Sequence, residues 1–551
     1  MTGLLIRNVR IVPFRDHHRL ARLHAYGSGD PHLARAQGAA LRRAATVRGV
    51  AVGEPVDLLI RAGRVVEMGR GIDAPGAQEL DAQGASALPG LWEAHAHLDL
   101  EAARAARLDL SASRAPEQAL ALVRAALDAA SAGAGTVAPA VQGFGFRLAQ
   151  WSRMPTVEEL DAVSGSVPVV LISGDVHSGW LNSAALRALG VADPGGPLSE
   201  DPWFEVMNRL DELPGAREMR ERGYRDVVAD MVARGVCGVV DMTQPGAPDD
   251  WSQRVRAWGD LPLPRIRAAI YRTQLEAWVG AGLRTGDPLP ASPRDEGGHA
   301  LFTQGPLKVI ADGSMGTCTA HSQVAYPTGL GVEHAHGVAN VSRQELTELA
   351  RLATGAGLDM AVHAIGDACL EDVAAALLAS GARGRIEHLQ LVGEPGEAGG
   401  PETLAALARA GIEGSVQPAH LLDDWSAVSR VWPGRESRCL AFADLVGAGL
   451  ALHLGSDAPV APLDPWLAMA VAVGREVEPG RVWFPEQRLT PEEAVAASVD
   501  GSGPVAVGSS ADIVLCEHNP LAPATDASEA AERLRNTRPV MSVVAGRVIS
   551  G

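Results

Sequence analysis

The chain has 551 residues, of which 46% are hydrophobic and 21% charged, and this ordinary globular composition favours one large domain with accessory elements. Its 66 acidic residues outnumber the 48 basic ones, and the net charge of −18 disfavours nucleic acid or an anionic membrane surface as a partner. The N-terminal stretch MTGLLIRNVRIVPF alternates apolar and polar residues, unlike a secretion signal, and no run of about 18 uncharged apolar residues follows. These features predict a soluble cytoplasmic protein.

Strand patterns occur at both ends of the chain. Four segments alternate with a period of two: 4–12 (LLIRNVRIV), 56–69 (VDLLIRAGRVVEMG), 511–519 (ADIVLCEHN) and 539–550 (PVMSVVAGRVIS). We expect both ends to form one small β-sandwich domain from residues 1–88 and 501–551. The segment 15–54, rich in Arg, His and Ala, is either a surface helix or a mobile excursion.

The middle of the chain alternates short β-branched runs with longer helical patterns. In chain order the runs are PGLWEAHAH, GVCGVVDM, RIRAAIY, PLKVIADGS, DMAVHAIGD, GRIEHLQLV, IEGSVQP and LALHLGSDAP. Eight strands with helical spacers predict an α/β fold in which residues 89–500 form a closed parallel (β/α)8 barrel of the TIM type. The spacer at about 100–230 is far longer than one helix requires, which predicts an inserted subdomain after barrel strand 1 that covers the barrel mouth.

One basic residue differs from all the others. Lys308 is the only lysine among 48 basic residues, and the rest are arginines. Arginine keeps its proton, whereas a buried lysine can lose its proton and react with a carbonyl or with CO₂. We therefore expect position 308 to require an amine, with an accident of an arginine-rich composition as the alternative.

Residues that can bind metal occur at the ends of the barrel strands, the face where barrel enzymes carry their chemistry. His95 and His97 stand two apart in strand 1, so the pleat turns both imidazoles to one face and lets them reach one ion. The other strand-end residues of this kind are Lys308, His363, His388 and Asp457, on strands four, five, six and eight. A single histidine at a strand end is commonly structural, but six such residues are hard to explain as independent packing choices.

These motifs resemble the amidohydrolase superfamily, and specifically amidohydrolase family 3, the branch that contains N-substituted formamide deformylases. The matching stretches cover almost the whole chain and are LPGLWEAHAHLD, QGFGFRLAQW, PTVEELDAV, PVVLISGDVHSGWLNSAAL, KVIADGSMGTCTA, VHAIGDACL, GRIEHLQLV, SVQPAH, GSDAPVAPLDPW, LTPEEAVAAS and SSADIVL. The sequence departs from the family pattern at 498–506, which is shorter than usual, and at 15–54. Neither departure involves the candidate ligands.

The resemblance implies a site for two divalent metal ions. The pair His95 and His97 is expected to bind one ion, and the pair His363 and His388 the second. Asp457 is expected to contact metal and to transfer protons. Zinc is the ion that imidazole and carboxylate ligands favour, with manganese, iron or cobalt as alternatives.

The resemblance also gives the lone lysine a role. Lys308 would carry a CO₂-derived carbamate, whose two oxygens can span ions about 3.5 to 4 Å apart. The family pattern and the composition argument thus reach the same residue independently.

Four more residues have two interpretations each. Asp175 and His177, in GDVHSGWLNS, match a family segment near the active site and either bind substrate or form a structural turn. His420 follows a strand end and has the same two interpretations. Trp180 either lines a pocket for a bulky substrate group or packs in a core.

The expected activity is hydrolysis of a C–N bond in a small-molecule amide, formamide, carbamate or cyclic imide. A metal-activated water would attack the carbonyl, and Asp457 would carry its proton to the departing nitrogen. A metal-assisted lyase or isomerase, including a decarboxylase, shares these ligands and is the alternative. A non-catalytic binding protein is less consistent with a complete ligand set. A homodimer is a further expectation.

Overall fold

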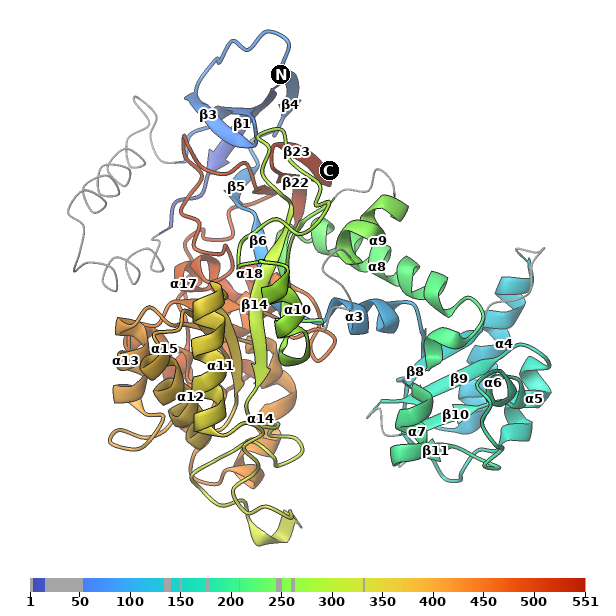
Figure 1. Cartoon of the computed structure of the whole chain (residues 1–551). Coiled ribbons are helices and arrows are strands. Elements are labelled where there is room, and N and C mark those ends of the chain that lie inside the picture. The colour runs from blue at the N-terminus through green and yellow to red at the C-terminus, as the bar shows by residue number, and fades with distance from the viewer. Residues whose placement is uncertain are drawn as a thin grey trace. The chain divides into compact units, whose positions relative to one another are not determined.

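The structure, a computed structural model, describes residues 3–14, 53–132, 140–148, 151–174, 178–207, 209–243, 250–258, 263–330 and 332–550 (Figure 1). It divides into two compact units, one formed by Met1–Leu98 with Val228–Gly551 and the other by Asp99–Val227. Nearly all of the atypical segment 15–54 lies outside the described residues. The domain boundaries proposed from sequence, and a covering role for the insertion, stay predictions.

The first unit contains a barrel of eight parallel strands. In chain order these are β6 (Leu91–Ala96), β12 (Val236–Asp241), β13 (Arg265–Tyr271), β14 (Phe302–Ile310), β15 (Met360–Ala364), β16 (Gly384–His388), β17 (Glu413–Val416) and β18 (Leu452–Leu454). Each strand pairs in parallel with the next one in this order. The predicted α/β barrel is therefore confirmed, and each of the eight runs identified in the sequence overlaps one observed strand.

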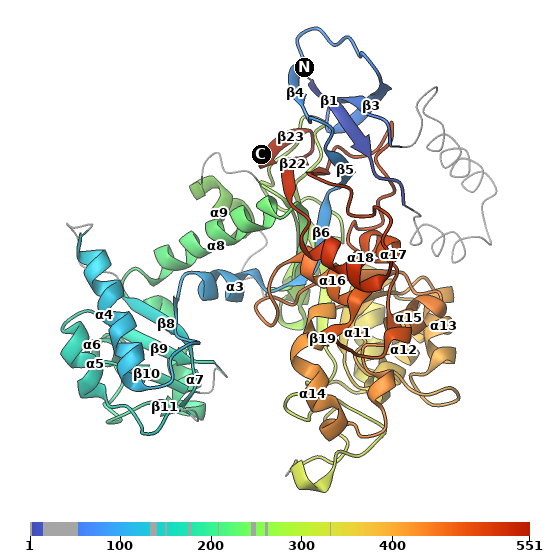
Figure 2. The same ribbon diagram turned by 180° about the vertical axis from the view of Figure 1, so that it is seen from behind.

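Helices pack on the outside of this barrel (Figure 2). The helices that lie entirely within the first unit are α9 (Asp250–Trp258), α10 (Leu275–Gly280), α11 (Arg343–Ala356), α12 (Asp367–Ser380), α13 (Pro401–Arg409), α14 (Leu421–Val431), α15 (Phe442–Gly447), α16 (Pro465–Gly474), α17 (Pro491–Ala496) and α18 (Ala527–Arg535). In α11, a capping box between Ser342 and Glu345 starts the helix and the left-handed Gly357 ends it. Every helix among the described residues is too short or too polar to cross a lipid bilayer.

The barrel strands alternate apolar residues facing the helices with polar residues facing the barrel interior. In β14, Leu307 and Val309 belong to the main hydrophobic cluster with the helices, and the intervening Lys308 is buried on the other side. In β15, Val362 belongs to the same cluster and His363 does not. The sequence thus supplies an apolar outer face that docks the helices and an inner face that carries ionisable groups.

The first and last barrel strands are joined at their C-terminal ends. The backbone N–H of Asp457, beyond β18, donates to the carbonyl of His95 at 2.7 Å, and that of His97 donates to Ala458 at 2.9 Å. Gly455 makes this approach sterically feasible, because a Cβ atom there would lie 2.8 Å from the His95 nitrogen. The buried Glu93 carboxylate also links the two segments, accepting from the N–H groups of His95 at 2.9 Å and Ser456 at 2.8 Å.

Both ends of the chain join in one further sheet, where the two termini lie close together in Figure 1. Its strands are β1 (Leu4–Ile11), β2 (Val56–Arg61), β3 (Arg64–Gly69), β4 (Gln78–Asp81), β5 (Ser86–Pro89), β21 (Ile513–Cys516), β22 (Pro539–Val544) and β23 (Arg547–Ser550). Strand β5 connects the ends, pairing in parallel with β1 and antiparallel with β21. A sandwich of two facing sheets stays a prediction.

The second unit has its own sheet and core. Its elements include β7 (Leu108–Asp109), α4 (Pro116–Ala132), β8 (Val141–Phe146), α5 (Val157–Ser164), β9 (Val169–Ser173), β10 (Ser178–Leu181), α6 (Ser183–Ala188), β11 (Leu198–Ser199) and α7 (Glu200–Met207), and α3 (Leu98–Ala105) and α8 (Ala216–Ala233) lie at its boundaries. Val169 and Leu171 of β9 pack in one cluster with α4, while Val170 and Ile172 pack in another with α6. Alternate residues of β9 therefore bury two apolar faces, as a central strand requires.

Replacing Gly455 by alanine should disturb the closure of the barrel. The added methyl group would press on the His95 backbone, so we expect a loss of about 1 to 3 kcal/mol in the free energy of unfolding. Chemical denaturation measures this loss. Gly355→Ala is the matched control, because a Cβ atom at this exposed position in α11 meets no atom within 4 Å, and it should stabilise the helix. A Gly455→Ala protein as stable as the Gly355→Ala protein would contradict the close approach.

Candidate metal centre

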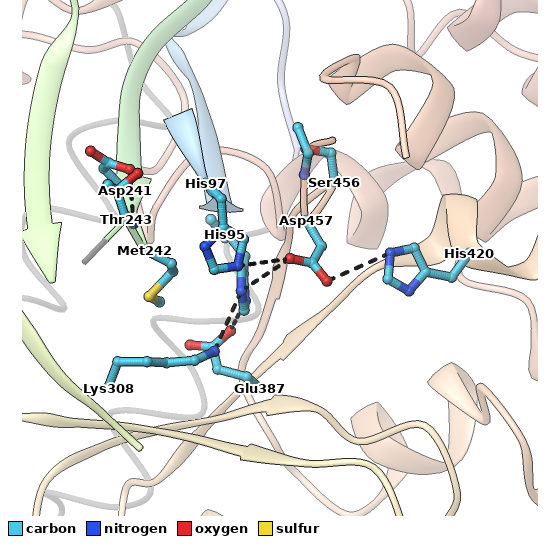
Figure 3. A network of polar contacts seen from close by, with 12 residues as sticks. His95, His97, Asp241, Met242, Thr243, Lys308, Glu387, His420, Ser456 and Asp457 are labelled. Atoms are coloured by element: carbon cyan, nitrogen blue, oxygen red, sulfur yellow. Dashed lines mark hydrogen bonds and ion pairs between the residues drawn. The ribbon is translucent and has the colours of Figure 1, made fainter. Parts of the chain in front are cut away.

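The ends of β6 and β18 bring two histidines and an aspartate together (Figure 3). The Nε2 atoms of His97 and His95 lie 3.2 Å and 3.4 Å from Oδ1 of Asp457. Two ligands of one tetrahedral zinc ion stand about 3.3 Å apart, given Zn–N and Zn–O bonds of about 2.0 to 2.1 Å. The spacing of these three side chains therefore fits a shared cation.

A second group of donors shares the same aspartate. His388, His420 and Asp457 each offer one ligand atom, and these atoms lie within 4.8 Å of one another. The ring centroids of His363 and His388 are 4.5 Å apart, and Nζ of Lys308 lies 3.4 Å from Nε2 of His95. The structure thus gathers all six ligand candidates in one cluster, and it adds His420, which the sequence suggested as a substrate contact.

The backbone at His388 explains how this cluster is assembled. His388 has φ 77°, and the N–H of Leu389 donates to the carbonyl of Glu387 at 3.1 Å, closing a tight turn of the γ type. Successive strand residues normally point to opposite faces, but this turn lets both Glu387 and His388 reach His95. Asp457 also has a positive φ of 57°. Left-handed backbone at bulky residues is strained and concentrates at functional sites.

Two fully buried carboxylates orient histidines of the cluster. Oε2 of Glu387 lies 2.7 Å from Nδ1 of His95, and Oδ1 of Asp312 lies 3.0 Å from Nδ1 of His363. A carboxylate at Nδ1 fixes the neutral ring with its proton there and leaves the Nε2 lone pair available to a cation. Arg385 in turn donates to the other Glu387 oxygen at 2.6 Å.

Burial and neighbouring charges set the protonation of the centre. Burial, helped by the Lys308 charge, lowers the pKa of His95 to about 4, and burial and the neighbouring His363 hold the pKa of His388 well below its ordinary value. Both imidazoles are thus neutral near pH 7, the form that binds metal. Burial also lowers the pKa of Lys308. Although burial opposes ionisation of Asp457, the surrounding histidines outweigh it and lower the pKa of this carboxyl.

Sequence reasoning missed the residues behind the histidines. Glu387 directly precedes the candidate ligand His388, and strand alternation allows only one of two neighbouring residues to face the barrel interior. Asp312 follows β14 in the motif ADG, where an acid after a barrel strand was a usable signal. Glu93 is buried in β6 between apolar residues, and burial raises its pKa to about 7.

The structure describes two of the four proposed substrate contacts, Trp180 and His420. Asp175 and His177 lie outside the described residues. Trp180 is fully buried in the core of the second unit, and its indole N–H donates to the carbonyl of Thr156 at 2.8 Å. This placement favours the core interpretation of Trp180. His420 faces the cluster, with Nε2 4.0 Å from Oδ2 of Asp457 (Figure 3).

Comparisons with known proteins give one family match, several relatives and a shared fold. The sequence profile described as "Amidohydrolase family" matches residues 78–550. "Protein LONG AFTER FAR-RED 3" of Arabidopsis thaliana is 27% identical over 80% of this chain and 78% of its own length. "N-substituted formamide deformylase" of Arthrobacter pascens is 25% identical over 85% of this chain and 91% of its own length. An uncharacterized metal-dependent hydrolase from Pyrococcus horikoshii OT3 shares the fold, with a TM-score of 0.72, 22% identity, and coverage of 95% of this chain and 99% of its own.

Glu387→Gln should weaken metal binding without removing a ligand. The amide can still accept a hydrogen bond from His95, but it lacks the negative charge that makes the imidazole a stronger electron-pair donor to a metal ion. Affinity for Zn²⁺ should therefore fall about 10- to 100-fold. Competition with a chromophoric chelator measures this. Glu413→Gln is the matched control, because Glu413 contacts His453 at 2.8 Å and neither residue belongs to the cluster. Equal Zn²⁺ affinities in the two variants would contradict the orienting role of Glu387.

Proposed function

The chain belongs to the amidohydrolase family, and from this premise we propose that it hydrolyses a C–N bond in an amide, formamide, carbamate or cyclic imide. The observation that carries the proposal is the convergence of His95, His97 and Asp457, with the other candidate ligands beside them, at the C-terminal ends of the barrel strands. The relative from Arthrobacter pascens makes N-substituted formamides the first substrates to test.

Two divalent metal ions, zinc first among the candidates, complete the proposed centre. His95 and His97 hold one ion, and His363 and His388 hold the second. The donor set fits divalent ions, because the buried imidazoles of His95 and His388 are neutral and their ligand atoms lie near the ionised Asp457 carboxylate. Bound divalent ions act as Lewis acids on a substrate carbonyl and lower the pKa of water.

Asp457 is the proposed proton carrier. Its Oδ1 faces His95 and His97, so Oδ2, which faces His420, is the oxygen available to a proton. The ionised carboxylate takes the proton that water loses as it attacks the carbonyl carbon. It then gives this proton to the nitrogen as the C–N bond breaks, leaving a carboxylic acid and an amine from an amide or formamide, and a single ring-opened acid from a cyclic imide.

Lys308 is proposed to carry a carbamate formed with CO₂. Its burial and lowered pKa favour the neutral amine that this reaction needs, and Nζ lies 3.4 Å from a candidate ligand atom of His95. The carbamate replaces a cation with an anion in the barrel interior, where it can hold both ions.

His420 is proposed to contact the substrate beside Asp457, as are Asp175 and His177 from the motif outside the described residues. A lyase or isomerase, including a decarboxylase, is the competing activity on the same ligands. A cytoplasmic location and a homodimer remain predictions from the sequence.

Amine release from a panel of N-formyl, N-acyl and carbamate compounds, together with ring opening of cyclic imides, tests the proposed function. We expect turnover of at least one class, close to two divalent ions per chain by elemental analysis, and loss of turnover when a chelator removes them. A decarboxylase would release CO₂ without an amine. Full activity in protein that contains no metal would contradict the mechanism.

Lys308→Arg should lose most activity and most of the second ion. Arginine keeps the positive charge and similar length but forms no carbamate. Lys308→Ala should also be inactive, and small carboxylic acids at high concentration should restore part of its turnover by occupying the vacated position. Metal content and turnover are measured together for both variants. A fully active Lys308→Arg enzyme would contradict the carbamate, and the single lysine would then be an accident of an arginine-rich composition.

A further inference from the structure

The turn that follows β17 buries two nitrogen atoms with no hydrogen-bond partner among the described residues. They are Nε2 of Gln417 and Nε2 of His420, which belong to one turn closed by a bond from the His420 N–H to the Gln417 carbonyl at 3.1 Å. The Gln417 side chain is only 1% exposed. Leaving a buried amide without a partner is costly, and such groups in folded proteins call for a functional explanation.

The strand register places Gln417 beside the metal centre. Val416 packs in the hydrophobic cluster between strands and helices, so alternation turns Ser415 and Gln417 toward the barrel interior. Ser415 pairs with Glu387 on β16, which puts Gln417 two residues closer to the C-terminal mouth than the carboxylate that orients His95.

The neighbouring strand leaves room on this side. Val416 pairs with Leu454, so Gln417 stands beside Gly455, and the N–H of Gly455 donates to the Val416 carbonyl at 3.0 Å. Gly455 is packed against His95. Because glycine has no side chain, Gly455 places no side chain between Gln417 and His95.

We propose that Gln417 donates a hydrogen bond from Nε2 to the acyl oxygen of the substrate, an inference that rests on the proposed hydrolysis of a C–N bond. The amide NH₂ group can only donate, and a substrate carbonyl can only accept. The bond strengthens as attack of water moves an electron pair onto that oxygen, so Gln417 stabilises the transition state more than the bound substrate. The same donor binds a carboxylate oxygen of the acid product.

Gln417→Met tests this role, because methionine has a similar length and no donor. We expect kcat/KM for the amide substrates to fall about 100- to 1000-fold, mostly in kcat, at unchanged metal content. The melting temperature should not fall, because the lost amide has no partner in the described structure. Gln487→Met is the matched control: this buried glutamine accepts from the Asp444 N–H at 3.2 Å, so its loss should lower the melting temperature and leave turnover intact.

Binding of formate and acetate separates this inference from the proposed reaction. Both acids should stabilise the metal-loaded wild-type protein in a thermal-shift titration, and Gln417→Met should bind them at least about 10-fold more weakly. If no amide is turned over, the proposed reaction fails while this titration still tests Gln417. Wild-type protein that binds neither acid, a variant with unchanged acid affinity, or a variant that loses its metal would overturn the role of Gln417.

Discussion

The barrel closes through backbone hydrogen bonds between β6 and the segment after β18, and the candidate metal centre depends on this closure. The same contact that joins the carbonyl of His95 to the N–H of Asp457 brings their side chains within 3.4 Å of each other. Gly455 permits the approach, and the buried Glu93 carboxylate fixes it by accepting from both segments. Fold and centre are therefore set by one local geometry, so a change that opens the barrel at this seam also separates the ligands.

Below this seam the barrel interior carries charge where many barrels carry branched apolar side chains. Glu387 stands between the Arg385 guanidinium and the His95 ring, and both of its oxygens are used. Burial alone would raise the pKa of Glu387, but Arg385 and His95 outweigh it and hold that pKa well below the ordinary value. A buried carboxylate remains ionised only with such partners, and its charge in turn favours cations at the imidazole it orients.

Family membership and substrate choice rest on different parts of the molecule. The family profile and the fold of the Pyrococcus horikoshii protein concern the scaffold, which hosts many reactions in such barrels. The curated relatives from Arabidopsis thaliana and Arthrobacter pascens share about a quarter of their aligned residues with this chain and bear unrelated names. We propose that the side chains around the candidate ligands, Gln417 and His420 among them, define the substrate of this chain.

The sequence by itself determined the barrel, its eight strands and the cluster of candidate ligands, because alternation and strand-end positions are local features that survive without knowledge of neighbours. It could not reveal that Glu387 and His388 both reach His95, since strand alternation turns only one of two neighbours inward and the left-handed turn at His388 brings in the second. The role of Asp312 likewise follows from its contact with His363 on another strand, and that of Gln417 from a buried Nε2 atom without a hydrogen-bond partner among the described residues. Tertiary structure decided these roles, because hydrogen bonding and burial are properties of residues that meet only when the barrel closes.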